Sequence, residues 1–183
     1  MLARLKPVVE KARKEFLKAT DPNFIHHRLY TKELPIKNKK GSIYTKLNTI
    51  RVGNFKHYEA EYLTDSATFP EDKEHTQKAV MLELMPLVRN KKSELTYAQK
   101  VRQAINNGDL LVGCTCEAFL YWGYRFICTR LKVVHPQFKE LRPPDIRNPQ
   151  RRGIICKHLD LVLHVLPFNA SKITGDLKKV IKK

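Results

Sequence analysis

Three of the four cysteines in the chain stand in two short patterns, one of which also contains a histidine. Cys114 and Cys116 form Cys-x-Cys, and Cys156 and His158 form Cys-x-His. Three cysteines with one histidine are a common ligand set of closed structural zinc sites. Residues i and i+2 of an extended strand lie on the same side, so Cys114 and Cys116 could hold one ion at a strand end, and Cys156 and His158 could do so at a helix start. The pattern predicts one Zn²⁺ bound by all four side chains.

Ordinary burial is the alternative explanation of these residues. Cysteine is among the most buried residue types, and His158 could be a partly buried histidine. The spacer of residues 117–155 is also too long for a local finger. Cys128 lies beside apolar and aromatic residues, which predicts a core position. His164 should lie on another face of its helix and is not expected to be a ligand.

The predicted ligand set argues against catalysis. Four protein ligands fill a tetrahedral zinc, whereas a catalytic zinc keeps an open position for water. The sequence contains no Walker-type glycine loop, dinucleotide fingerprint, Gly-x-Ser-x-Gly elbow or His-Glu-x-x-His motif. We therefore expect a protein that is not an enzyme and has no small-molecule substrate.

Basic residues dominate the charge of the chain. It carries 35 Lys and Arg against 18 Asp and Glu, a formal net charge of +17. Two basic regions, residues 1–58 and 91–183, flank an acidic segment at 59–90. This division predicts contact with a polyanion or an acidic protein surface, and a solvated basic surface is the alternative. The predicted nucleic-acid or partner contacts are Lys37, Lys39, Lys40, Arg142, Arg147, Arg151 and Arg152.

No membrane partner is expected. The sequence has no apolar run near the roughly 20 residues that span a bilayer. Its first residues, MLARLKPVVEKARKEF, lack the apolar segment of a secretory signal. The thiols should therefore lie in a reducing compartment, where a Cys/His cluster favours metal over disulfides.

The first part of the chain predicts a helix followed by a small sheet. Residues 7–18 place apolar side chains on one helical face after a proline suited to a helix start. Residues 24–63 contain short segments rich in β-branched and aromatic residues, with a turn at Gly53-Asn54. These segments predict a small antiparallel sheet.

Two helices are expected in the middle of the chain. Residues 73–88 predict a helix that Pro86 bends or ends. Thr96 and Gln99 have the spacing of a capping box, and Asn107-Gly108 supplies the end of the short helix that follows.

Elements of the last third would position the predicted ligands. Residues 109–116 predict a strand that ends at the first cysteine pair. Residues 119–131 predict a helix weakened by Gly123, and the three prolines of 141–153 predict an irregular loop. Residues 156–166 predict a helix that begins at Cys-x-His.

These elements predict an α+β fold with three parts. Residues 1–108 form an N-terminal α+β region of unknown type, comprising a helix, a small antiparallel sheet and the middle helices. Residues 109–166 form a zinc-binding module, and residues 167–183 form a basic C-terminal tail.

The last third resembles a known zinc-binding family. Cys-x-Cys followed by a distant Cys-x-His resembles the SWIM-type zinc finger, a ββα-like module. The segments CTCEAFLYWGYRF, RPPDIRNPQRRG and CKHL resemble more specifically small SWIM-like proteins of tailed bacteriophages. The resemblance covers about residues 109–166, and the long spacer departs from the usual finger. The matching positions are Cys114, Cys116, Phe119, Pro143, Pro144, Asn148, Pro149, Gly153, Cys156, Lys157, His158 and Leu159.

This resemblance implies a non-enzymatic structural component of a phage particle, in its head, neck or tail. Its partners would be other virion subunits, with packaged DNA as a further candidate, and it would reside in the virion after synthesis in the host cytoplasm. The alternative is a basic zinc-finger protein that binds nucleic acid as a regulator, with Tyr121, Trp122 and Tyr124 stacking on bases. A third possibility is a cellular adaptor that uses the finger for protein contact.

Overall fold

The computed structural model describes residue 7 and residues 43–65, 74–146, 151 and 153–182. The predicted helix at 7–18, apart from Pro7, and the first segment of the predicted sheet lie outside these residues. No helix in the described ranges is long and apolar enough to cross a membrane.

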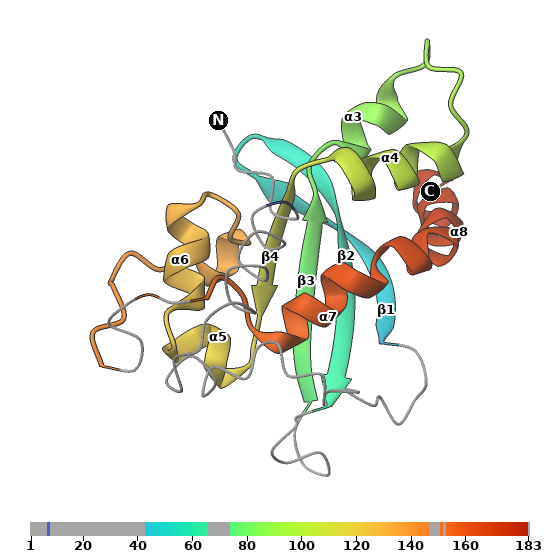
Figure 1. The fold of residues 1–183 in the computed structure, drawn as a ribbon. Coiled ribbons are helices and arrows are strands. Elements are labelled where there is room, and N and C mark those ends of the chain that lie inside the picture. Colours follow the sequence, from blue (N-terminus) through green and yellow to red (C-terminus); the bar gives the residue numbers. More distant parts are fainter. Residues whose placement is uncertain (1–6, 8–42, 66–73, 147–150, 152, 183) are drawn as a thin grey trace.

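A four-stranded antiparallel sheet forms the centre of the described fold, with its strands side by side in chain order (Figure 1). The strands are β1 (Tyr44–Val52), β2 (Phe55–Asp65), β3 (Glu74–Met81) and β4 (Leu110–Cys114). β1 and β2 form a hairpin in which Val52 pairs with Phe55, and Gly53 has a φ of 59°. Glycine suits this left-handed turn position, which confirms the turn expected at Gly53-Asn54.

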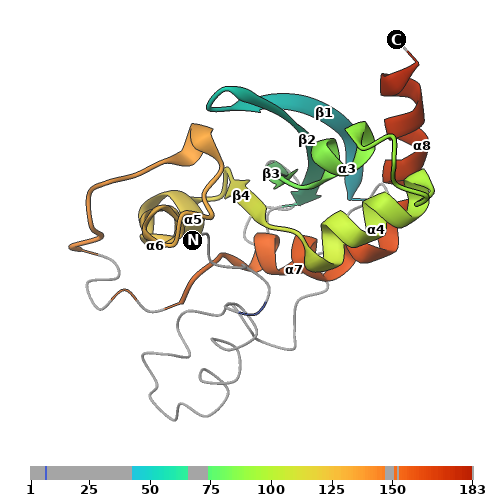
Figure 2. The same cartoon turned by 90° about the horizontal axis from the view of Figure 1, so that it is seen from above.

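Helices lie mainly against one face of this sheet. They are α3 (Leu84–Arg89), α4 (Tyr97–Asn107), α5 (Glu117–Tyr121), α6 (Tyr124–Arg130), α7 (Lys157–Val165) and α8 (Ala170–Ile181), with short 3₁₀ helices at Pro136–Phe138 and Pro167–Asn169. Figure 2 shows α4, α7 and α8 on the same side of the sheet, with α5 and α6 beside β4. The arrangement confirms an α+β fold.

The core lies between the sheet and these helices. Alternate residues of a strand face the same side, so one face of each strand supplies apolar side chains. Buried core residues from the strands are Tyr58, Ala60, Tyr62, Ala79, Met81, Leu110 and Val112, and those from α4, α7 and α8 are Val101, Ala104, Ile105, Leu159, Val162, Ile173 and Leu177.

The helix predicted over residues 73–88 is wrong for its first half, which forms β3. Glu, Gln, Lys, Ala and Met favour helices, and their presence suggested one. In the fold, β3 pairs with β2 on one side and β4 on the other, so its backbone N–H and C=O groups form hydrogen bonds with both neighbours. Its alternate residues Gln77, Ala79 and Met81 are fully buried. Strand pairing and burial therefore override intrinsic propensity.

Pro86 does not end the helix that follows. It occupies the third position of α3, in the first turn, where backbone N–H groups have no partner within a helix. The predicted capping box of α4 is confirmed: the Gln99 N–H donates to Thr96 Oγ1 at 3.3 Å, and the Thr96 N–H donates to Gln99 Oε1 at 2.8 Å.

The helix predicted over residues 119–131 is divided in two. Gly123 separates α5 from α6 and has a φ of 83°, in the left-handed region that glycine adopts most easily. A Cβ at this position would also collide with Pro144. The segment of residues 141–146, called the proline loop below, therefore packs directly on the helix break at Pro144.

The predicted part boundaries differ from the described architecture. β4 lies after residue 108 but pairs with β3, so the sheet continues across that boundary. Residues 170–181, expected within a basic tail, form α8. Its Ile173 and Leu177 are fully buried.

Candidate metal centre

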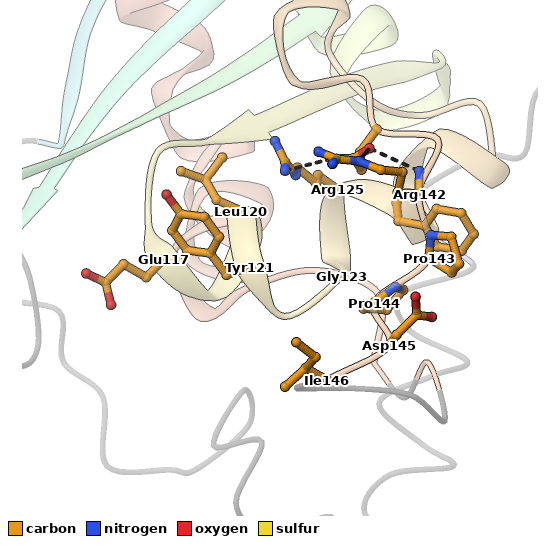
Figure 3. A pocket seen from close by; sticks show the side chains of 12 residues that line it. Glu117, Leu120, Tyr121, Gly123, Arg125, Arg142, Pro143, Pro144, Asp145 and Ile146 are labelled. Atoms are coloured by element: carbon orange, nitrogen blue, oxygen red, sulfur yellow. Dashed lines mark hydrogen bonds and ion pairs between the residues drawn. The ribbon is translucent and has the colours of Figure 1, made fainter.

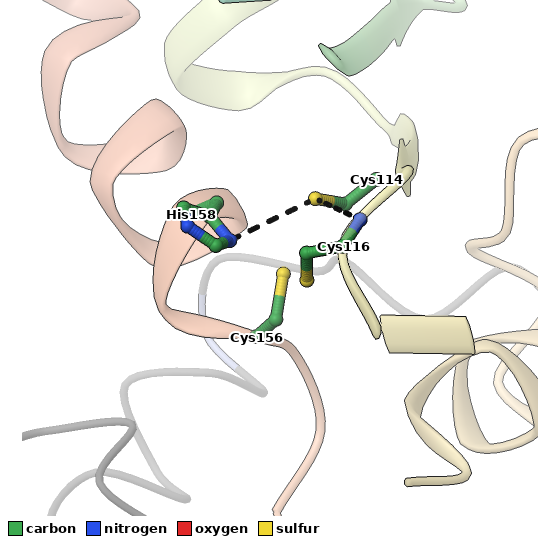
Figure 4. A group of neighbouring side chains, drawn as sticks. All are labelled: Cys114, Cys116, Cys156 and His158. Atoms are coloured by element: carbon green, nitrogen blue, oxygen red, sulfur yellow. Dashed lines mark hydrogen bonds between the residues drawn. The ribbon is translucent and has the colours of Figure 1, made fainter. Parts of the chain in front are cut away.

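The four predicted ligands lie at the ends of three elements. Cys114 is the last residue of β4, and Cys116 is the N-cap residue of α5. Cys156 is the N-cap residue of α7, and His158 lies in the first turn of that helix. The strand end and the start of α7 therefore bring the two pairs together across the long spacer (Figure 4).

The donor atoms of these residues form a compact group. One ligand atom from each of Cys114, Cys116, Cys156 and His158 lies within 4.8 Å of all the others. The four residues are at most 2% exposed. Figure 4 shows the three sulfur atoms and the imidazole ring around a common centre. Such a group can surround one small cation from several sides.

Backbone groups donate hydrogen bonds to two of the sulfur atoms. The Cys116 N–H donates to Cys114 Sγ at 3.4 Å, and the Phe119 N–H donates to Cys116 Sγ at 3.4 Å. The second contact is the N-cap contact of α5. A thiolate accepts such bonds better than a neutral thiol, so these donors suit deprotonated, metal-binding cysteines.

The electrostatics of the centre also suit a cation. Burial raises the pKa of the Cys114 and Cys156 thiols. Hydrogen bonds from Cys114, then from Cys156, lower the pKa of Cys116. Without a cation, the three buried sulfurs can hold only part of the negative charge of three thiolates. A divalent metal would stabilise all three thiolates together.

The imidazole of His158 lacks ordinary hydrogen-bond partners among the described residues. Its Nδ1 lies 4.0 Å from Cys114 Sγ, and its Nε2 is buried without a partner. The ring of the half-buried His75 packs against it, with ring centroids 4.8 Å apart. A buried imidazole that faces three sulfurs and lacks other partners fits a metal ligand. The residues of this site therefore fit a bound metal ion.

The two residues excluded from the predicted ligand set do not belong to the cluster. Cys128 is fully buried, its Sγ donates to the Ile154 carbonyl oxygen at 3.3 Å, and burial raises its pKa to about 12. His164 packs against Phe168, with ring centroids 6.0 Å apart.

The predicted basic contacts are described only in part. The Arg142 side chain is 87% exposed, and its Nε lies 3.4 Å from Glu140 Oε1. Arg151 is exposed, with its guanidinium carbon 5.4 Å from the centre of the Phe126 ring. Lys37, Lys39, Lys40, Arg147 and Arg152 lie outside the residues that the structure describes.

The aromatic residues after Cys116 do not form one exposed row. Tyr121 is 62% exposed, whereas Tyr124 is 1% exposed and belongs to the core. Trp122 is half-buried and packs against the core. Base stacking by all three rings is therefore incompatible with this fold, because Tyr124 is inaccessible.

A cleft of about 740 Å³ lies between α5, α6 and the proline loop (Figure 3). Its lining includes Tyr121, Arg125, Glu140 and Arg142. Arg125 pairs with Glu140 at 2.7 Å, and Arg142 also approaches this carboxylate. The backbone N–H of Arg142 is the main cause of the lowered pKa of Glu140. These contacts tie the loop to α6.

Gln77 is a residue near the centre that sequence reasoning missed. It pairs with Cys114 in the register of β3 and β4, and its Nε2 lies 3.7 Å from Cys114 Sγ. Because a helix was expected over residues 73–88, the pairing of Gln77 with Cys114 was not predicted. Residues 74–81 read EHTQKAVM and show no apolar alternation of period 2, so the sequence carried no clear signal for this strand.

Comparisons of the chain with protein-family models, curated proteins and solved structures found no match. The candidate centre therefore depends on its residue types and their geometry.

Proposed function

We propose that Cys114, Cys116, Cys156 and His158 together bind one Zn²⁺ in a structural site. The observation that carries this proposal is the compact group of four buried donor atoms, all within 4.8 Å of one another. Three sulfurs and one nitrogen match a common tetrahedral zinc ligand set. Four protein ligands leave no open position for a substrate or water, so the site serves stability rather than catalysis.

Metal analysis of the purified protein tests this proposal. We expect one zinc per wild-type chain and a loss of zinc in Cys156→Ala. Cys128→Ala is the matched control, because Cys128 is an equally buried cysteine outside the cluster. It should keep the metal. A wild-type protein without zinc, or Cys156→Ala with full zinc content, would contradict the proposal.

The proposed role of the whole protein is that of a non-enzymatic structural component of a phage particle, in its head, neck or tail. The resemblance of residues 109–166 to SWIM-like phage proteins supports this role. In this role, the zinc would stabilise a fold that contacts other virion subunits. The SWIM-like character of residues 109–166 is part of the same proposal. The net charge of +17 suits acidic subunit surfaces or packaged DNA.

Mass spectrometry of purified particles from a producing host tests this role. We expect peptides of this chain in the particle at a fixed ratio to its major subunits, together with stoichiometric zinc. A chain that is made in the host but is absent from washed particles would contradict it.

The alternative is a basic zinc-finger protein that binds nucleic acid as a regulator, which the high positive charge favours. It predicts sequence-selective binding of the isolated protein to DNA at physiological salt. A salt-dependent but sequence-independent affinity would instead reflect charge alone. Selection of one DNA sequence with nanomolar affinity would favour the regulator over the particle component.

A further inference from the structure

Gln77 is a polar side chain in a mainly apolar layer. It lies on the helix-facing side of the sheet and is 0% exposed. Its neighbours on that face of β3, Ala79 and Met81, belong to the hydrophobic core. Burying an amide costs free energy unless hydrogen bonds replace those to water. Its Oε1 is buried without a partner among the described residues, so only the partners of its amide nitrogen compensate this burial.

The amide nitrogen of Gln77 has three such partners. It lies 2.8 Å from Thr64 Oγ1, 2.7 Å from the His75 carbonyl oxygen and 3.7 Å from Cys114 Sγ. Thr64 is itself fully buried on the adjacent strand β2. The amide has two N–H groups for these three acceptors, so the contact with the sulfur shares an N–H with one of the two oxygens, and the oxygen contacts hold the amide beside the sulfur.

Cys114 therefore accepts hydrogen bonds from two directions. The Cys116 N–H approaches its sulfur at 3.4 Å from the same turn, and the Gln77 amide approaches from the neighbouring strand. Two donors restrict the direction of the remaining lone pairs on the sulfur. These lone pairs are the ones that a metal shared with Cys156 and His158 would use.

We infer that Gln77, anchored by Thr64, is a positioning residue of the metal centre. It orients the Cys114 thiolate and withdraws electron density from its sulfur. This inference rests on the proposed zinc site. Groups that orient metal ligands in this way typically change metal affinity by about 10- to 100-fold when they are removed.

Zinc competition with a chromophoric chelator, carried out on the full chain, measures the affinity. Gln77→Met keeps an apolar chain of similar length and removes the N–H donor. We expect zinc affinity to fall about 10- to 100-fold. Gln137→Met is the matched control, because Gln137 is exposed and its side chain accepts from Lys78 Nζ at 3.0 Å. Its zinc affinity should stay unchanged.

Cobalt substitution separates positioning from a general loss of stability. A thiolate that loses an N–H donor is more electron-rich, so its charge-transfer band with Co²⁺ should move to longer wavelength in Gln77→Met. A purely structural role of Gln77 would lower stability but leave the band in place. The band should remain at its wild-type position in Gln137→Met.

Thr64 provides a second test that does not alter Gln77. Thr64→Val removes the anchoring oxygen and should produce a smaller fall in zinc affinity and a smaller shift of the cobalt band. Thr64→Ser retains the hydroxyl and should show wild-type affinity and band position. If Gln77→Met does not fold, this pair decides the question. Absence of zinc from the wild-type protein would refute the proposed site itself. If the wild-type protein binds zinc and Gln77→Met has unchanged zinc affinity and cobalt spectra, only the role of Gln77 is refuted. If Gln77→Met does not fold, the same result in Thr64→Val refutes that role.

Discussion

Glu59 and His135 form a buried pair on the sheet face opposite the helices. His135 Nε2 lies 2.6 Å from Glu59 Oε2, and the Gln137 N–H donates to His135 Nδ1 at 3.2 Å. Because Nδ1 accepts a hydrogen bond, the ring proton lies on Nε2 and is donated to Glu59. Lys78 Nζ, 4.0 Å from Glu59 Oε1, adds a positive charge beside this carboxylate.

Glu59→Gln should reveal a pH-dependent contribution to stability. Burial raises the pKa of Glu59, but the hydrogen bond from His135 and the charge of Lys78 outweigh it and hold the pKa below its ordinary value of 4.5. Such stability is complete above the unfolded-state pKa and is lost as the pH falls through the folded-state pKa. We expect the variant to lose about 1–3 kcal/mol of unfolding free energy at pH 7.

Denaturant unfolding of both proteins between pH 7 and pH 3 measures this effect. The difference between wild type and variant should shrink below pH 4.5, the ordinary pKa of the carboxyl. Glu61→Gln is the control, because Glu61 pairs with the exposed Lys46 at 3.4 Å and such surface pairs contribute at most about 1 kcal/mol. A difference for Glu59→Gln that stays constant with pH would contradict a stabilising Glu59 carboxylate.

Gly113 is required by a close approach rather than by its backbone angles. A Cβ at this position would collide with the ring of Phe138, which packs edge-on against Phe119 at 5.8 Å. Gly113→Ala should therefore destabilise the protein by about 1–3 kcal/mol in thermal or denaturant unfolding. Gly175→Ala is the control, since nothing lies within 4 Å of its added Cβ. That change in α8 should stabilise by about 0.5–1 kcal/mol, and equal effects of both changes would contradict this packing.

Among the elements, α8 differs most in role from its sequence-based prediction. Its high lysine content suggested a basic tail, yet its apolar residues recur at helical spacing. Ile173 and Leu177 are fully buried, and Tyr44 Oη of β1 donates to Asp176 Oδ2 at 2.8 Å. The helix therefore covers the first strand of the sheet and also packs on α4 (Figure 1).

Ile173→Ala should destabilise the fold strongly if α8 is part of the core. Removing this buried side chain leaves a cavity and should cost about 2–5 kcal/mol in denaturant unfolding. Ile181→Ala, at the 39% exposed end of the same helix, is the control and should cost less than about 1 kcal/mol. A loss for Ile173→Ala as small as that for Ile181→Ala would indicate a tail.

At the scale of the molecule, the candidate metal centre lies where parts distant in sequence meet. The strand end at Cys114 and the start of α7 are separated by α5, α6 and the proline loop. A bound metal would fix both ends of the chain segment between them and thereby lower its conformational entropy.

Removal of zinc should lower the stability of the whole fold. At a free zinc concentration about a thousandfold above Kd, the metal contributes about 4 kcal/mol. For a chain of this size, that corresponds to a fall in Tm of about 8–16 °C when a chelator removes the metal. Cys128→Ala should respond to the chelator as the wild type does, whereas Cys156→Ala should not respond. A wild-type Tm that is indifferent to chelator would contradict a structural metal.

The sequence by itself determined those features that depend on local chemistry. The capping box at Thr96 and the turn at Gly53 were predicted correctly, because residues a few positions apart suffice to define them. The two Cys/His pairs are visible in the sequence, and the fold places their four side chains together. The irregular conformation of residues 141–146 likewise follows from the local prolines.

Only the tertiary structure decided the features that depend on distant neighbours. β3 is a strand because β2 and β4 flank it, although its residues favour a helix. The burial of α8 and the contact of Gln77 with Cys114 also depend on partners far away in the chain. Propensity differences amount to less than about 1 kcal/mol per residue, so strand pairing and the burial of apolar surface outweigh them once the chain is folded.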